Sequence, residues 1–266
     1  MPIAGRELTG RPVTDDKGSR FWDVDALRGV AIMMVVLYHL VYDLDNFGGY
    51  PIESTAGFWA LFADASAFLF VFLVGLSLTL SYSRTSATQR PTGTLFGKYV
   101  RRGLRIFAYG MVITLVFRLL DYGYVIFGIL HLIGISIILA YPFLKLRAAS
   151  LLLGLAIVAT GTYIQAKDLV AGGIAGVLLA PLGVLPEGLM MPDYRPLLPW
   201  FGVVLLGVFF GNAAYLPWRK RSPSGEMPNH GAPIAFLGRH TLLIYLVHQP
   251  VLIATLWVLG IIDVGF

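Results

Sequence analysis

The chain has 266 residues, of which 57% are hydrophobic and only 13% are charged, and its mean hydropathy is +0.74. A soluble domain is about one quarter charged, so a chain this apolar cannot cover its own surface with polar groups in water. We therefore predict an all-α, polytopic integral membrane helix bundle. The chain contains no cysteine, which excludes disulfides, thiolate metal sites and a cysteine nucleophile.

Seven apolar stretches are long enough to cross a hydrocarbon core of about 30 Å as helices. In chain order they cover residues 26–43, 57–81, 99–120, 124–144, 148–165, 197–216 and 234–262. An eighth apolar stretch, residues 169–185, contains several glycines and Pro181, so it is either a further span or a re-entrant or interfacial segment. Gly207 and Gly211 form a G-x-x-x-G pair, which favours the close approach of another helix.

The distribution of Lys and Arg distinguishes seven spans from eight, because cytosolic loops of membrane proteins are enriched in these residues. With seven spans and a cytosolic N-terminus, 17 of the 20 Lys and Arg residues lie on the cytosolic side, and with eight spans only 14 do. The sequence therefore favours seven. We expect a disordered cytosolic tail over residues 1–19 and a single transmembrane domain over residues 20–266, in the inner (plasma) membrane. The basic loops would face anionic lipid, which explains the net charge of +5 without a nucleic-acid partner.

Ionisable residues inside spans are costly, so each is a candidate for function. From the rise of about 1.5 Å per residue, His39 and His248 each lie roughly 20 Å from the cytosolic boundary, and Asp64 and His131 lie roughly 10 Å below the outer one. These depths agree in a core about 30 Å thick, so we predict that the four side chains share one level. Each histidine alone is also consistent with a packing role. A metal site made by the three histidines is a rival that we do not favour, because their spacing matches no common ligand pattern.

The first span carries Arg28 and His39, which are 11 residues apart and therefore leave the helix on one face, roughly 16 Å apart along it. Asp43 is four residues after His39, within reach of it. We predict that Asp43 fixes the tautomer of His39 and makes it a better base. The alternative is that Asp43 only caps the outer end of the helix.

Arg28, Arg105 and Arg239 each lie slightly inside a predicted span at its cytosolic end. Guanidinium groups bind phosphate bidentately, so we predict that these three arginines form a phosphate-binding cluster. Many other cytosolic Lys and Arg residues determine topology alone.

Four segments resemble the bacterial branch of the heparan-alpha-glucosaminide N-acetyltransferase catalytic-domain family. They are WDVDALRGVAIMMVVLYHLVYD (residues 22–43), FLVGLSLTLS (72–81), FGILHLIGIS (127–136) and LGRHTLLIYLVHQP (237–250). The Arg-x10-His spacing of Arg28 and His39 also resembles the motif of the transmembrane acyltransferases that O-acetylate bacterial polysaccharides. These families transfer an acyl group from cytosolic acyl-CoA to an acceptor on the far side of the membrane.

The resemblance implies acetyl-CoA as the donor substrate, held by Arg28, and His39 as the general base or acyl-relay residue, with His248 in the same cavity. Animal members of the family place their proposed catalytic histidine beyond the first span, where this chain has none before His131. Either His39 takes that role or the reaction has changed. We therefore expect an acyl-CoA-dependent transmembrane N- or O-acyltransferase that acts on a hydroxyl or amine of an extracytosolic sugar or glycan. No metal is expected.

Two other classes of function remain open on the sequence. In the first, a proton-coupled transporter or flippase uses the intramembrane histidines and Asp64 as a proton relay. In the second, the chain is an assembly protein that has lost an earlier activity. Transporters of this kind often contain paired broken helices, and the chain shows one such segment, residues 169–185. A single broken segment, instead of a pair, favours the enzyme over the transporter. The expected partners are then the lipid bilayer, acyl-CoA and the acceptor, and the sequence also leaves open whether the protein forms a homo-oligomer.

Overall fold

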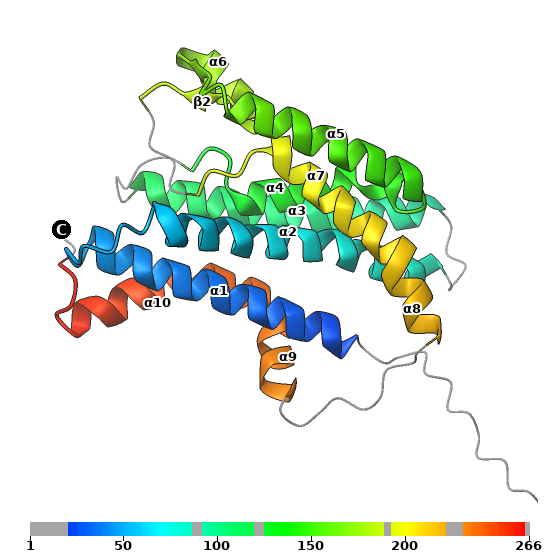
Figure 1. Cartoon of the computed structure of the whole chain (residues 1–266), viewed down its shortest axis with the longest axis horizontal. Helices are drawn as coiled ribbons and strands as arrows, with labels where there is room; N and C mark the ends of the chain where they lie inside the picture. Colours follow the sequence, from blue (N-terminus) through cyan, green and yellow to red (C-terminus); the bar gives the residue numbers. More distant parts are fainter. Residues whose placement is uncertain (1–20, 87–91, 120–124, 189–192, 222–230, 264–266) are drawn as a thin grey trace, which may run out of the picture.

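The computed structural model describes residues 21–86, 92–119, 125–188, 193–221 and 231–263, so the tail predicted over residues 1–19 lies outside the described part. The described residues are almost entirely helical and pack as one bundle (Figure 1). The longer helices are α1 (Trp22–Asn46), α2 (Gly57–Ser86), α3 (Thr92–Leu119), α4 (Ile129–Leu139), α5 (Arg147–Gln165), α7 (Leu197–Phe210) and α10 (Thr241–Val258). The shorter elements are β1 (Val170–Ala171), α6 (Gly173–Leu179), β2 (Leu185–Pro186), α8 (Leu216–Arg221) and α9 (Ala232–Arg239).

Five helices within the described residues are long and apolar enough to cross a membrane: Trp22–Asn46, Gly57–Ser86, Arg147–Gln165, Leu197–Arg221 and Thr241–Val258. The fourth of them consists of α7, the π-helical turn Gly211–Tyr215 and α8. The chain is therefore a multi-pass, all-α membrane protein. The helix α3 has 28 residues, a sufficient length, but its first half carries Lys98 and three arginines, so it is not among the five. The count of seven spans and the side of the N-terminus stay predictions.

Two predicted spans differ from the structure, and the segment that the sequence left open forms no spanning helix. Residues 124–144 were expected to form one span, but the helix there, α4, has only 11 residues and is roughly 16 Å long. Residues 169–185 form the two-residue strands β1 and β2, paired in parallel, around the seven-residue helix α6, and are too short for a spanning helix. The last predicted span, residues 234–262, is broken at His240 into α9 and α10.

The break at His240 leaves the last carbonyl groups of α9 in need of donors, which side chains provide. The hydroxyl of Thr241 donates to the carbonyl of Gly238 at 2.6 Å, and the ring of His240 donates from Nδ1 to the carbonyl of Phe236 at 2.9 Å. In Figure 1, α9 crosses α1 steeply while α10 runs beside it. His248 thus lies 7 residues after the start of its own helix, α10. The predicted depth of His248 assumed one continuous helix from residue 234, and that assumption is wrong.

Glycines allow several helices to approach at backbone distance. A Cβ atom at Gly238 would overlap the carbonyl oxygen of Asp25, and one at Gly29 would overlap that of Ile234, so α9 lies directly on α1. A Cβ at Gly207 would overlap the carbonyl oxygen of Phe72 in α2. The G-x-x-x-G prediction is confirmed, because Gly207 and Gly211 both face α2.

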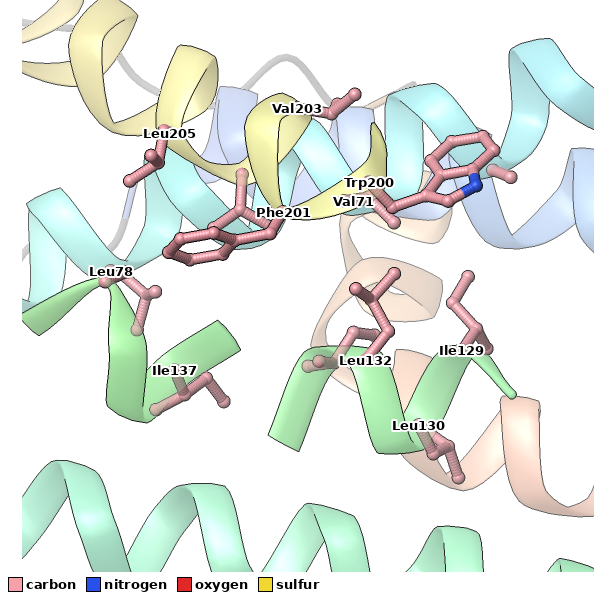
Figure 2. Close-up of a cluster of buried hydrophobic side chains, with 14 of the residues drawn as sticks. Val71, Leu78, Ile129, Leu130, Leu132, Ile137, Trp200, Phe201, Val203 and Leu205 are labelled. Carbon is pink, nitrogen blue, oxygen red and sulfur yellow. The ribbon is translucent and has the colours of Figure 1, made fainter. Parts of the chain in front are cut away.

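The main hydrophobic core lies where α2, α4 and α7 meet. Figure 2 shows side chains of α7, among them Trp200 and Phe201, above Leu132 and Ile137 of α4. Val71 of α2 closes this core, and α5 packs on the outer side of α7. The short α4 is thereby fixed inside the bundle, with its N-terminal end directed toward the residues described next.

Candidate active site

His39 of α1 and His248 of α10 lie in direct contact, with ring centroids 4.9 Å apart in an edge-to-face arrangement. His248 is only 7% exposed and His39 is half-buried. The two helices run side by side in Figure 1. The ring contact joins one helix to the other. The structure therefore brings together two of the predicted site residues, from opposite ends of the chain.

The backbone fixes the tautomer of His248. Its Nδ1 lies 2.7 Å from the carbonyl oxygen of Tyr245, and because a carbonyl can only accept, Nδ1 carries the hydrogen and donates. The lone pair of a neutral His248 then resides on Nε2, which is buried and has no hydrogen-bond partner. A histidine whose second nitrogen is oriented in this way is prepared to accept a proton.

Asp43 does not orient His39 as predicted. Its Oδ1 instead accepts a hydrogen bond of 2.7 Å from the side-chain amide of Gln249, the residue after His248. The other oxygen of Asp43 and Nδ1 of His39 are both buried without a partner. Asp43 is fully buried. Because its hydrogen bond to Gln249 joins α1 to α10, it does not merely cap a helix end.

Unsatisfied polar atoms gather at this cluster. In the described part of the chain, seven buried side-chain nitrogen or oxygen atoms have no hydrogen-bond partner, and four of them belong to these neighbouring residues. The four atoms are Nδ1 of His39, Oδ2 of Asp43, Nε2 of His248 and Oε1 of Gln249. Buried polar groups are nearly always hydrogen-bonded, so this concentration indicates a place where a polar molecule binds.

A second set of contacts extends from His248 toward α4 through residues that we did not predict. The ring of Tyr245 lies 5.3 Å from that of His248, and its hydroxyl donates to Oδ2 of Asp193 at 3.2 Å. The same oxygen accepts from the backbone N–H of Ile129, at the start of α4. Burial raises the pKa of the Asp193 carboxyl, although nearby Arg195 and these hydrogen bonds act in the opposite direction.

His131 makes its contacts at the start of α4. Its Nδ1 accepts a hydrogen bond of 3.2 Å from the backbone N–H of Gly128, so it caps the first turn of α4. Its ring is 1% exposed and packs edge-on against Phe107 at 5.0 Å. The lone pair that a general base needs is already engaged, which favours a structural function.

Asp64 also lies apart from the histidine pair. Its side chain is 66% exposed and pairs with Arg195 at 3.7 Å, and Arg195 in turn lies over the ring of Trp200 at 5.2 Å. The structure therefore places Asp64 on the surface near the cluster and not within it.

Two adjoining cavities near the N-terminal end of α1 are lined by basic residues. The first, of about 290 Å³, is lined by Arg28, Arg84, Lys98 and Arg102 among others. The second, of about 820 Å³, is lined by Lys98, Arg101, Arg102 and Arg105 with three uncharged residues. We call these two the basic cavities. Lys98 and Arg102 line both, so the two cavities are neighbours.

Two of the three predicted phosphate-binding arginines line the basic cavities, and one does not. Arg28 lines the first cavity and forms an ion pair of 3.1 Å with Asp25. Arg105 lines the second. Arg239 is exposed, lies over the ring of Phe236 at 5.9 Å and is not among the residues that line either cavity.

The face of α1 between the two regions is tightly packed. Arg28 and His39 are roughly 16 Å apart along the helix. Ile32 and Val35 occupy the same face between them and belong to the main core, at 1% and 8% exposure. In this conformation, apolar side chains thus separate the basic cavities from the histidine pair.

Possible metal ligands were also sought among the described residues. Across residues 21–263, leaving aside the segments that the structure does not describe, no three His, Asp or Glu side chains are placed to share a metal ion.

The family model for the catalytic region of heparan-alpha-glucosaminide N-acetyltransferase matches residues 20–250. The chain belongs to this family. The matched region contains the residues that line the basic cavities, and it also contains His39, His248, Asp43 and Gln249. Comparisons with curated proteins and with solved structures find no match. The family name points to a membrane acetyltransferase, which agrees with the resemblance noted in the sequence.

Proposed function

We propose that this protein is a membrane-embedded acetyltransferase that moves an acetyl group from cytosolic acetyl-CoA to a hydroxyl or amine of a sugar or glycan on the other side. Family membership supports the acetyltransferase activity. The separation of the basic cavities from the histidine pair along α1 supports the transfer between two sides. The observation that carries most weight is the contact between His39 and His248, because it joins the first and last helices within the matched region.

The anionic part of acetyl-CoA is proposed to bind in the basic cavities. Arg28 and Arg105, expected from the sequence, are joined there by Lys98 and Arg102. Guanidinium groups suit phosphate oxygens because they donate two parallel hydrogen bonds. Arg239 is not included, because it is not among the residues that line these cavities.

The acetyl group then has to reach the histidine pair along α1. Ile32 and Val35 occupy this face, so their side chains must move aside for an acyl-pantetheine arm to pass. At the pair, a histidine removes the proton of the acceptor as it attacks the thioester, a step that typically contributes about 10²- to 10⁴-fold. A covalent acetyl-histidine relay at His39 is the variant that the second ring permits.

The first test is calorimetric binding of acetyl-CoA to the detergent-purified protein, compared with S-acetylpantetheine, which lacks the nucleotide. We expect acetyl-CoA to bind and the truncated thioester to bind far more weakly, because the basic cavities recognise phosphates. The affinity for acetyl-CoA should also fall as salt is added, since ions screen exposed charges.

Absence of acetyl-CoA binding by folded protein would contradict the proposal and would favour the transporter. Equal binding of both thioesters would keep an acyl donor but remove the basic cavities from its recognition.

A further inference from the structure

The polar atoms around His248 have an uneven balance of hydrogen-bond donors and acceptors. Gln249 uses its amide N–H on Asp43, and His248 uses its Nδ1–H on the carbonyl of Tyr245. Of the four buried atoms without a partner at this cluster, Nδ1 of His39 donates or accepts according to its tautomer, and three remain: Oδ2 of Asp43, Oε1 of Gln249 and Nε2 of His248. All three are acceptors, because carboxylate and amide oxygens and an unprotonated ring nitrogen offer only lone pairs.

A molecule that binds here must therefore supply hydrogen-bond donors. The thioester group has none, and the amide N–H groups of the pantetheine arm lie beyond the sulfur, away from the acetyl carbon, so the partner that brings donors to the reacting centre is the acetyl acceptor. Asp43 is fully buried and His248 is 7% exposed, so bulk water does not reach either side chain. Leaving such groups unpaired costs free energy, which makes the site selective for molecules with several donors.

We infer that Asp43 and Gln249 form a specificity-determining clamp that recognises an acceptor with hydrogen-bond donors on neighbouring atoms, and that Nε2 of His248 takes the proton of the reacting group. The inference rests on the proposed function. The bond between the acceptor nitrogen or oxygen and the acetyl carbon forms as the carbon–sulfur bond breaks. The proton passes to Nε2 of His248 and from there to the CoA thiolate, which leaves as the free thiol.

Two probe acceptors test the clamp, because they share one skeleton and one amine and differ in two hydroxyl groups; their rates are compared at equal concentrations of the free amine. Serinol carries one amine and two hydroxyl groups on a three-carbon skeleton, and isopropylamine is the same skeleton with the amine alone. With labelled acetyl-CoA, we expect the purified wild-type protein to use serinol with a kcat/KM at least about tenfold higher, because each additional hydrogen bond contributes several-fold.

The Asp43→Asn variant probes the clamp with little change of shape. Its remaining oxygen can still accept from Gln249, while an NH₂ group replaces the acceptor Oδ2. We expect KM for serinol to rise about 3- to 10-fold, the preference over isopropylamine to fall by the same factor, and the affinity for acetyl-CoA to be unchanged. Gln249→Met is the second variant, in case Asp43→Asn does not fold. Gln165→Met is the matched control, because Gln165 is exposed at the end of α5.

The clamp is overturned if the wild type binds acetyl-CoA but acetylates neither probe, or acetylates both equally, since water would then suffice for the three acceptors. It is also overturned if the variants change KM for acetyl-CoA instead of serinol, or if Gln165→Met has the same effect. A wild-type protein that binds no acetyl-CoA would instead remove the proposed function itself.

Discussion

Replacement of His248 by alanine is expected to lower kcat for acetyl transfer about 100- to 10,000-fold, the usual contribution of a general base. The affinity for acetyl-CoA should be unchanged, because the basic cavities lie roughly 16 Å away along α1. The reason for choosing His248 is its geometry: Tyr245 fixes the hydrogen on Nδ1, and Nε2 is buried without a hydrogen-bond partner. Steady-state transfer rates beside calorimetric binding measure the two effects separately.

His240 provides a matched control for that experiment. Its Nδ1 also contacts a backbone carbonyl, that of Phe236 at 2.9 Å, but its side chain is exposed. We expect the His240→Ala variant to retain nearly the wild-type rate. A His248→Ala variant within about threefold of wild type, well under the usual contribution of a general base, would contradict the role assigned to its Nε2.

Replacement of Arg102 by alanine is expected to raise Kd for acetyl-CoA about 10- to 100-fold, since a hydrogen bond to a charged group typically contributes about 1.5–3 kcal/mol. Arg102 lines both basic cavities and is partly buried, so it is the residue best placed to hold a phosphate group. It is also a cleaner probe than Arg28, whose loss would leave the buried Asp25 without its ion pair. Calorimetry on the purified variants gives the change in Kd.

The Arg239→Ala variant is the control for Arg102, because it removes the same charge outside both cavities. We expect its Kd to equal that of the wild type. Equal losses in the two variants would show that only general positive charge attracts the donor, and the basic cavities would then have no specific role. An Arg102→Lys variant should recover part of the affinity, since lysine keeps the charge but not the bidentate geometry.

The sequence predicted those features that depend on regular periodicity. Arg28 and His39 were placed on one face of α1 by the helical repeat, and the Gly207–Gly211 pair was correctly expected to face another helix. The contact between His39 and His248 agrees with the shared level predicted for them. Hydropathy also identified the five long apolar helices, although it merged α9 with α10.

The errors come from places where tertiary contacts override the local pattern. A carboxylate four residues from a histidine can reach it. Asp43 instead accepts a hydrogen bond from Gln249, which lies in a helix more than 200 residues away in the chain. His131 accepts a hydrogen bond from the backbone N–H of Gly128, at the start of its own helix. Hydropathy cannot show either choice, because both depend on which donor the fold brings closest.

Tyr245 and Asp193 were missed for different reasons. Tyr245 is three residues before His248, a spacing at which its carbonyl faces the histidine ring in a helix, so this signal was available. Asp193 lies in an irregular segment just before α7, where no periodicity applies. Only the folded chain shows that it joins Tyr245 to the start of α4.

The most direct test of the central claim is the release of CoA thiol from acetyl-CoA by the purified protein in the presence of serinol. Because the chain contains no cysteine, every thiol detected in the assay comes from CoA. We predict release that requires both protein and acceptor and that falls about 100- to 10,000-fold in His248→Ala. Thiol release that is the same in wild type and His248→Ala, or absent from folded protein that binds acetyl-CoA, would contradict the account.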